Sequence, residues 1–303
     1  MPVPVRNPLT GIAILVLGLF IIPAMDVLGK YLSDSYSVWQ ISWARFFFHF
    51  LFLAPFVLWR YRLKAILLPK QGLQILRGGF LMGATVTFFG ALALLPLADT
   101  LALSFVSPLL VTLLSPWLLG ERVGWRRRAA VFVGFAGVLI IVRPGFQEVG
   151  LGTLLALASG GSFAFYVIAT KKLAGSAPPM VTLAYTALLG CVVLSLLMTV
   201  GGESVWRWPD QEAWIMMAGI GAIAVVGHFL LISAYDHADA SLLAPFYYSE
   251  MIMSATLGYL VFGDFPDAWT WLGIAIIVAS GVYIALRERA LARERVRGVP
   301  AAL

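Results

Sequence analysis

Two pairs of ionisable residues stand four positions apart inside long apolar runs near the start of the chain. Asp26 and Lys30 form the first pair, and Arg45 and His49 form the second. Residues four apart lie on the same face of an α-helix, so each pair presents its polar groups together. Charged groups are costly in lipid and normally face a cavity or an opposite charge. Both pairs are therefore candidates for binding a polar substrate group or a coupling ion.

Each of these residues also has a structural explanation. Asp26 and Lys30 could form an ion pair near the outer end of a helix, with the Lys30 amine reaching for water along its flexible stem. Arg45 keeps its charge and needs a partner, which Asp26, Glu250 or a substrate anion could supply. His49 titrates near neutral pH in water, but a packed, hydrogen-bonded imidazole explains it equally simply.

Glu250 is the strongest single candidate for a substrate-binding or proton-carrying group. It lies near the middle of a long apolar run and follows the aromatic residues Phe246, Tyr247 and Tyr248. In a regular helix Phe246 lies one turn before Glu250, with Tyr247 beside it. An acid against aromatic rings suits a flat, polar heterocycle, which can stack and hydrogen-bond there. The alternative is a buried structural partner of Arg45.

His228 and Tyr166, in two other apolar runs, are secondary candidates for substrate contact, with packing as the alternative. Pro108 and Pro245 fall in the first half of two corresponding runs. Broken helices at matching places are typical of transporter binding regions, although a proline can also simply kink a helix. The histidines form no H-E-x-x-H metal motif, so we expect neither a metal nor a cofactor.

The composition excludes an ordinary soluble domain. Of the 303 residues, 61% are hydrophobic and 12% are charged, whereas soluble domains carry about 25% charged residues. The formal charge of +6 could suggest nucleic acid, but the basic residues sit in short loops between apolar runs. That pattern is typical of the cytoplasmic face of a membrane protein. We therefore expect a lipid bilayer around the chain and no nucleic-acid partner.

Ten apolar runs are long enough to cross a bilayer as helices, which need roughly 20 residues each. The predicted spans are residues 9–32, 38–59, 75–95, 100–119, 126–143, 151–171, 180–200, 212–234, 240–262 and 268–287. The fifth is the least apolar, because Arg126, Arg127 and Arg128 crowd its start. The predicted fold class is all-α, a polytopic membrane protein. The first run is too long for a signal peptide, so we expect it to be retained.

The basic residues predict the orientation of these spans. Most of the 21 Lys and Arg residues fall on the face that holds both termini, and Lys30, Arg143 and Arg207 fall on the other. The positive-inside rule then places the N- and C-termini in the cytoplasm, and an even number of spans agrees with that placement. We expect a multi-pass protein of the inner, or plasma, membrane.

The runs come in two matching sets, about 140 residues apart. Residues 99–142 start in "LADTLAL", contain "GER" and end in "GFAGVLIIV"; residues 239–286 start in "HADASLL", contain "GDF" and end in "VASGVYIAL". Five spans per copy is an odd number, so the second copy enters the membrane from the opposite side. We predict two inverted five-helix repeats, 1–145 and 146–287, followed by a charged cytoplasmic tail, 288–303. In such folds substrate binds near the midplane, between the repeats.

Two glycine patterns predict close approach between helices. Gly79 and Gly83 form G-x-x-x-G in the third predicted span, and Gly134 and Gly137 lie in the fifth.

With this layout, the sequence resembles the ten-span EamA-type branch of the drug/metabolite transporter superfamily. The resemblance rests on residues 118–140 and their weaker second copy at 261–284, and on residues 240–264, which include Pro245 and Glu250. Asp264 stands where the first copy has Glu121. Residues 25–47 resemble members that import riboflavin or S-adenosylmethionine.

The resemblance implies a secondary transporter of a small-molecule substrate, working by alternating access without ATP. Consistently, the sequence contains no G-x-x-x-x-G-K-[ST] loop. Riboflavin uptake is the first substrate expectation; S-adenosylmethionine uptake and amino-acid or drug export are the alternatives. An intramembrane enzyme is the competing class, but "LASGGSF" at 157–163 lacks the leading glycine of a rhomboid motif, and we expect no enzyme. A non-transporting scaffold would leave the buried charges without a purpose. A homodimer stays open.

Overall fold

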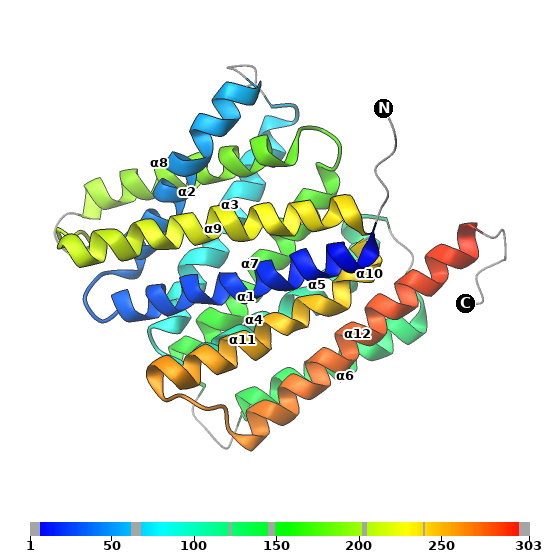
Figure 1. The fold of residues 1–303 in the computed structure, drawn as a ribbon. Coiled ribbons are helices and arrows are strands. Elements are labelled where there is room, and N and C mark those ends of the chain that lie inside the picture. The colour runs from blue at the N-terminus through cyan, green and yellow to red at the C-terminus, as the bar shows by residue number, and fades with distance from the viewer. Residues whose placement is uncertain are drawn as a thin grey trace.

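The computed structural model describes residues 7–61, 68–120, 123–144, 149–201, 205–238 and 240–296. Three residues that mark the predicted repeats, Glu121, Arg122 and Asp239, lie outside the described residues, as do Arg6, Arg62, Lys64 and the end of the tail from 297. The described chain is a bundle of helices, as predicted (Figure 1).

The helices follow the predicted spans closely. They are α1 (Pro8–Leu32), α2 (Val38–Tyr61), α3 (Gln71–Leu92), α4 (Leu97–Ser104), α5 (Val106–Leu118), α6 (Trp125–Val142), α7 (Leu151–Lys172), α8 (Pro179–Gly201), α9 (Gln211–His237) and α12 (Ala268–Val296), with the short elements of residues 240–262 between the last two. In the described part of the chain, 8 helices are long and apolar enough to cross a membrane. This confirms an all-helical, multi-pass membrane protein. Helix α12 continues past the predicted span into the tail.

Of the ten predicted spans, the fifth and the ninth fall outside those 8 helices. Helix α6 carries Arg126, Arg127 and Arg128 in its first turn, which lowers its apolar character. The ninth span is interrupted instead: it consists of α10 (Ala240–Leu243), the 3₁₀ helix η3 (Ala244–Tyr248), α11 (Ser249–Leu257) and the π-helical turn η4 (Gly258–Phe262).

The spans that contain Pro108 and Pro245 are both broken, which is one of the two possibilities that the sequence left open. Pro245 cannot donate a backbone hydrogen bond, and the chain around it tightens into η3. In the first half, α4 ends at Ser104 and α5 begins at Val106, so that Phe105 marks the break. The expectation of a regular helix from Phe246 to Glu250 is therefore wrong.

The helices pair in a pattern that is symmetric between the halves of the chain. Helix α1 packs along α9 and α3 packs along α7, while α2 packs on α8 and α6 on α12 (Figure 1). Exchanging each span with its counterpart five spans later maps the first pair onto the second. The same exchange leaves the α2–α8 and α6–α12 pairs unchanged. A two-fold relation between the halves requires this pattern.

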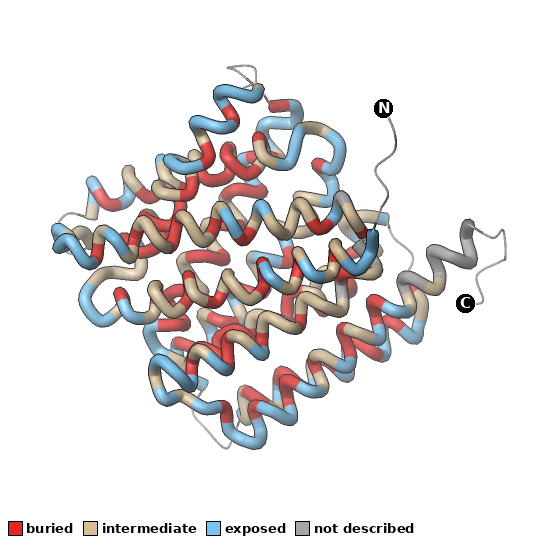
Figure 2. Tube along the Cα trace, in the orientation of Figure 1, coloured by how far each residue is buried: buried red, intermediate tan, exposed pale blue. Residues whose placement is uncertain are grey.

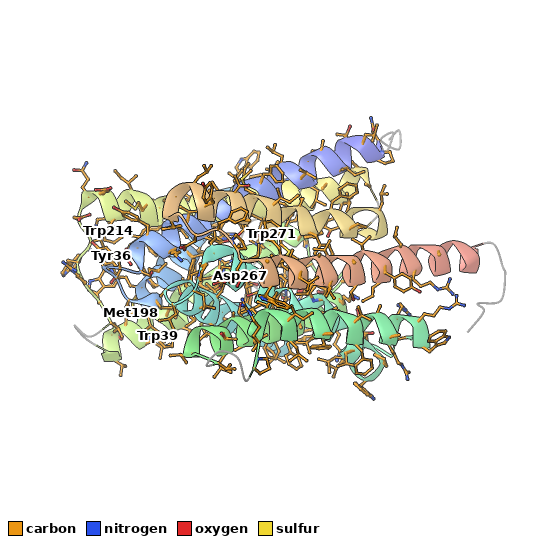
Figure 3. The ribbon with its side chains drawn as sticks, turned by 90° about the horizontal axis from the view of Figure 1, so that it is seen from below. Tyr36, Trp39, Met198, Trp214, Asp267 and Trp271 are labelled. Carbon is orange, nitrogen blue, oxygen red and sulfur yellow. The ribbon has the colours of Figure 1, made fainter. Side chains whose placement is uncertain are left out.

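The two ends of the bundle differ in their side chains. At one end, called the basic end, α1 begins and α12 ends (Figure 1). Exposed charges at this end are Arg60, Arg126, Arg128, Lys171 and Lys172. At the opposite end lie Tyr36, Trp39 and Trp214 (Figure 3). Tyrosine and tryptophan favour the membrane interface, so this aromatic group is consistent with a bilayer boundary.

Arg77, one of the basic residues on which the predicted orientation rests, belongs to the helical core. It lies in the second turn of α3 and is buried. Its charge is therefore no signal of which side a loop occupies.

Large apolar side chains cover much of the outer surface. Exposed examples on different helices are Trp59, Phe132, Val200 and Leu260. Exposed residues line the periphery of the helices, and buried ones gather where helices meet (Figure 2). A surface of this kind is solvated by lipid rather than by water.

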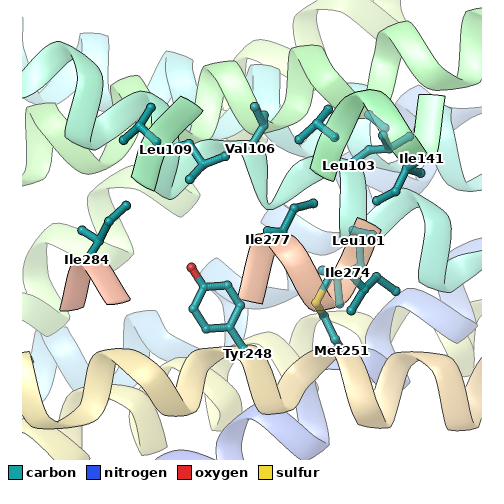
Figure 4. Close-up of a cluster of buried hydrophobic side chains, with 14 of the residues drawn as sticks. Leu101, Leu103, Val106, Leu109, Ile141, Tyr248, Met251, Ile274, Ile277 and Ile284 are labelled. Atoms are coloured by element: carbon teal, nitrogen blue, oxygen red, sulfur yellow. The ribbon is translucent and has the colours of Figure 1, made fainter. Parts of the chain in front are cut away.

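The largest buried apolar cluster joins the two halves of the chain (Figure 4). Leu101, Leu103, Val106 and Leu109 come from α4 and α5, Ile141 from α6, and Ile274, Ile277 and Ile284 from α12. Tyr248 and Met251 enter the cluster from the broken ninth span (Figure 4). The helix breaks are thus anchored on the α6–α12 pair.

The α6–α12 contact depends on glycine. A Cβ atom at Gly137 would lie 2.9 Å from the Gly273 carbonyl oxygen and 3.0 Å from Ile276 and Ile277 side-chain carbons. The predicted close approach at Gly137 is confirmed. At Gly79 it is wrong, because no atom lies within 4 Å of a Cβ there.

We predict that Gly137→Ala destabilises the protein by about 1–3 kcal/mol, because the added methyl overpacks the contact with Gly273. The matched control, Gly79→Ala, should be neutral or stabilising by up to about 1 kcal/mol, since alanine favours helix more than glycine. Unfolding of purified protein in mixed detergent micelles measures both. Equal stability of the two variants would contradict this account of the α6–α12 contact.

Candidate functional site

A cavity of about 460 Å³ lies inside the bundle, between the two halves of the chain. Its lining comes from α1, α2, α3, the α4–α5 break, α7, α9, the broken ninth span and α12. Most of the lining is apolar, with a small number of polar groups. Sites for small molecules commonly have this size and composition.

Three charged residues from three different helices reach the deep part of this cavity: Asp26 from α1, Arg45 from α2 and Glu250 from α11. Asp26 is 3% exposed and Arg45 is 9% exposed. Asp26 interacts electrostatically with both Arg45 and Glu250. The sequence therefore selected three groups that the fold brings together, from positions more than 200 residues apart.

None of the three is neutralised by direct contact with another. Asp26 and Glu250 take part in neither ion pair that the structure shows among its described residues, Lys30–Asp264 and Arg143–Asp267. Arg45 donates one hydrogen bond from Nη1 to Thr85 Oγ1, and its Nε has no partner. Buried polar groups in proteins are normally satisfied. This set is open to a ligand that offers both acceptors and donors.

Two further predicted residues line the same cavity, Tyr247 and His228. The Tyr247 hydroxyl hydrogen-bonds the hydroxyl of Tyr235 at 2.7 Å. His228 Nδ1 donates to the Ala224 carbonyl oxygen at 2.7 Å. Because a carbonyl can only accept, the neutral ring keeps Nε2 as a bare acceptor.

His49 does not line the cavity; it lies behind His228. The two imidazole centroids are 5.5 Å apart, and His49 is 5% exposed. His49 Nε2 has no hydrogen-bond partner among the described residues. A substrate would reach His228 first, so direct substrate contact by His49 is not supported.

Lys30 is placed away from Asp26, contrary to the pairing that we considered. Its Nζ lies 3.2 Å from Asp264 Oδ2 and donates to the Leu95 carbonyl oxygen at 2.7 Å. Phe246 is also misplaced by the sequence analysis. Because η3 is not a regular α-helix, Phe246 packs into an apolar cluster around Leu19 rather than lining the cavity.

Tyr166 serves the buried Arg77 rather than the cavity. Its hydroxyl accepts a hydrogen bond from Arg77 Nη2 at 2.8 Å, and its ring lies 4.7 Å from the guanidinium carbon. The same guanidinium also donates to Thr170 Oγ1 at 2.7 Å and to Thr186 Oγ1 at 2.8 Å. This network ties α3 to α7 and α8, so Tyr166 has a packing role.

The sequence analysis missed an aromatic pair formed by the two helix breaks. Phe105 and Tyr248 both line the cavity, and their ring centroids are 5.2 Å apart. Gly281 allows this placement, because a Cβ there would collide with the Tyr248 hydroxyl. A signal was present in the sequence, since Phe105 lies three residues before Pro108 and Tyr248 lies three residues after Pro245.

The cavity extends toward the basic end. Its lining includes Lys171 in the last turn of α7, and Ile284 and Ala285 in the second half of α12. Toward the other end it stops at Asp26 and Phe89. The cavity is therefore asymmetric along the bundle axis.

These features define a helical membrane protein with a ligand-sized cavity between the halves of the chain, mostly apolar and with a few charged groups. The sequence profile of the EamA-like transporter family matches the chain twice, over residues 9–143 and 150–286. The chain belongs to the EamA-like transporter family.

Curated relatives include transporters with different substrates. An S-adenosylmethionine uptake transporter of Rickettsia bellii is 28% identical over 92% of this chain and 94% of its own. A riboflavin transporter of Vibrio cholerae is 33% identical over 62% of each chain. A pseudopaline exporter of Pseudomonas aeruginosa is 26% identical over 92% of this chain and 97% of its own.

A solved crystal structure confirms the fold. It is 20% identical in sequence, superposes with a TM-score of 0.65, and covers 93% of this chain and 98% of its own.

We predict contrasting effects of removing the two tyrosine hydroxyls. Tyr166→Phe should cost about 1–2 kcal/mol of stability, because it removes an acceptor of the buried Arg77, and should leave substrate affinity unchanged. Tyr247→Phe should weaken substrate binding instead, because Tyr247 lines the cavity and the substitution removes the hydrogen bond to Tyr235 that orients its ring. Unfolding midpoints and equilibrium binding on the two purified variants separate these effects. Weakened binding by Tyr166→Phe at unchanged stability would contradict the assignment.

Proposed function

We propose that the protein is a secondary transporter that carries a small metabolite across a bacterial inner membrane through this cavity. The observation that carries the proposal is the set of Asp26, Arg45 and Glu250, which line the cavity without contacting one another as ion pairs. Ionisable groups within a membrane span are normally functional. A bound substrate would complete their interactions, and its release would reopen them.

The proposal includes the arrangement of the halves. We infer that residues 1–145 and 146–287 are inverted repeats, and the pairing of α1 with α9 and of α3 with α7 supports this. The positive-inside rule supports a cytoplasmic basic end. On that basis the structure is the state in which the cavity faces the cytoplasm.

The charges of the cavity favour a substrate with a cationic group. Two carboxylates face a single guanidinium in the deep part of the cavity, the other cation of the lining, Lys171, lies at the basic end, and the unpartnered Arg45 Nε needs an acceptor. The rings of Phe105 and Tyr248 suit a flat heterocycle. S-adenosylmethionine offers all three features: a sulfonium and an ammonium, a carboxylate, and an adenine ring.

Riboflavin, the first expectation from the sequence, is the second candidate. Its flavin ring fits the aromatic lining and its carbonyl oxygens could accept from Arg45. It is uncharged, however, and would leave two carboxylates to share the single Arg45 guanidinium in a low-dielectric site. The full-length similarity to S-adenosylmethionine uptake transporters also favours the charged substrate.

The binding site has no need of covalent chemistry to perform this role. Its groups converge on an open volume, and the curated relatives named above are transporters. We therefore propose transport and no enzymatic activity.

The test measures uptake of labelled S-adenosylmethionine and riboflavin into cells that express equal membrane levels of each variant. We expect Glu250→Gln and Asp26→Asn to lower uptake of the charged substrate about tenfold or more, because each removes a carboxylate that pairs with substrate cation. Glu212→Gln is the matched control, since Glu212 is exposed in the first turn of α9. Uptake of riboflavin alone would reassign the substrate. If both cavity variants bound and took up substrate as well as the wild-type protein, the proposed binding site would be wrong.

A further inference from the structure

The two ion pairs in which both partners are described residues connect one half of the chain to the other. Lys30 pairs with Asp264, and Arg143 pairs with Asp267. Lys30 and Arg143 belong to residues 1–145, and the two acids belong to residues 146–287. Both pairs lie at the end of the bundle opposite the basic end, where α1 and α6 finish and α12 begins. We call this the ion-pair end.

Lys30 joins three segments at the ion-pair end. Its Nζ lies 3.2 Å from Asp264 Oδ2, in the loop after η4. The same atom donates to the Leu95 carbonyl oxygen at 2.7 Å, in the connection between α3 and α4. It also lies 5.1 Å from the ring centroid of Phe262. One ammonium therefore ties α1 to the segments that precede α4 and α12.

The second ion pair is built on the start of α12. Asp267 Oδ1 accepts from the Thr270 backbone amide at 2.7 Å, and this bond lowers the pKa of Asp267. The Asp267 carboxylate also accepts from Arg143, which follows α6. Asp99, in the first turn of α4, is a further acid near these groups. Both pairs thus lie across a single seam between the halves.

An apolar plug lies between this seam and the cavity. Phe89 lines the cavity floor and is 2% exposed, and Leu92 and Leu97 beyond it are fully buried. Phe89 packs directly on α1, because a Cβ at Gly29 would collide with its ring. Gly29 is the neighbour of Lys30. The contact that closes the cavity and the ion pair therefore share one turn of α1.

We propose that the Lys30–Asp264 pair is the latch of a gate at the ion-pair end, with Phe89 as the plug beneath it. This inference rests on the proposed function, since alternating access requires the cavity to open at this end in its other state. Opening separates the α1 end from the loop after η4, so the latch breaks. Both partners are partly exposed, at 17% and 35% of their side-chain surface. An exposed pair of this kind is weak enough to break and re-form.

The first experiment locks the latch. In a Cys191→Ser background, which removes the chain's single cysteine, Lys30→Cys and Asp264→Cys are combined and joined with a short bifunctional thiol reagent. We expect cross-linked protein to retain substrate binding from the basic end and to lose transport. When the linker is one that a reductant can cleave, adding reductant should restore transport. Each single cysteine variant, treated identically, is the control. Transport at the uncross-linked rate by fully cross-linked protein would overturn the latch.

The second experiment needs no substrate. Phe88→Cys places a thiol on the cavity lining, and a membrane-impermeant maleimide is added from the ion-pair face of oriented vesicles. We expect Lys30→Gln to raise the labelling rate about fivefold or more, because the opened state gains population. Lys172→Gln, an exposed lysine at the basic end, is the matched control. Equal labelling with and without Lys30→Gln would overturn the gate.

The outcomes separate the two proposals. If the protein binds and transports a metabolite, but the cross-link does not change transport and Lys30→Gln does not change labelling, then the gate is refuted and the proposed function stands. If Lys30→Gln raises the labelling rate but the protein binds no metabolite in any state, then the gate stands and the proposed function is refuted.

Discussion

The structure depends on the cost of holding Asp26, Arg45 and Glu250 inside a membrane. Each group is brought to the cavity by a different helix, and none contacts another as an ion pair. Such charges are tolerated in lipid only where a cavity, water or a ligand can solvate them. The apolar exterior, the close α6–α12 packing and the interrupted helices are the scaffold that keeps this polar volume enclosed. The same unsatisfied chemistry supports our proposal that the cavity is a binding site rather than a packing defect.

The helix breaks follow from the same constraint. Irregular backbone is tolerated at membrane depth only where it is buried in protein or faces a cavity. Both breaks meet that condition, because Phe105 and Tyr248 meet across the cavity at a ring separation of 5.2 Å. Gly281 makes room for the tyrosine hydroxyl on one side. Backbone irregularity, aromatic contact and glycine placement are therefore parts of one arrangement, contributed equally by the two halves of the chain.

Hydropathy predicted the helices almost completely, because lipid imposes one strong rule on every span. The rule also identified Asp26, Arg45 and Glu250, since an ionisable group in an apolar run stands out in the sequence. It failed where a residue's role depends on a distant partner. Lys30 pairs with Asp264, and Tyr166 holds Arg77, across separations that no local spacing reveals. Phe246 was misplaced for a local reason, because the 3₁₀ geometry around Pro245 rotates its side chain away from the cavity.

The exchange symmetry of the helix pairing has a consequence for energetics. The α2–α8 and α6–α12 pairs map onto themselves when the halves trade places, so their contacts can be reused in a mirrored conformation. Two such conformations would be degenerate in a protein whose halves were identical. Here they are not: α2 brings Arg45 to the cavity, whereas its counterpart α8 contributes none of its described residues to the cavity lining. The equilibrium between the two conformations is then set by the positions at which the two halves of the chain differ in sequence. Sequence divergence between the halves is therefore a means of tuning that equilibrium.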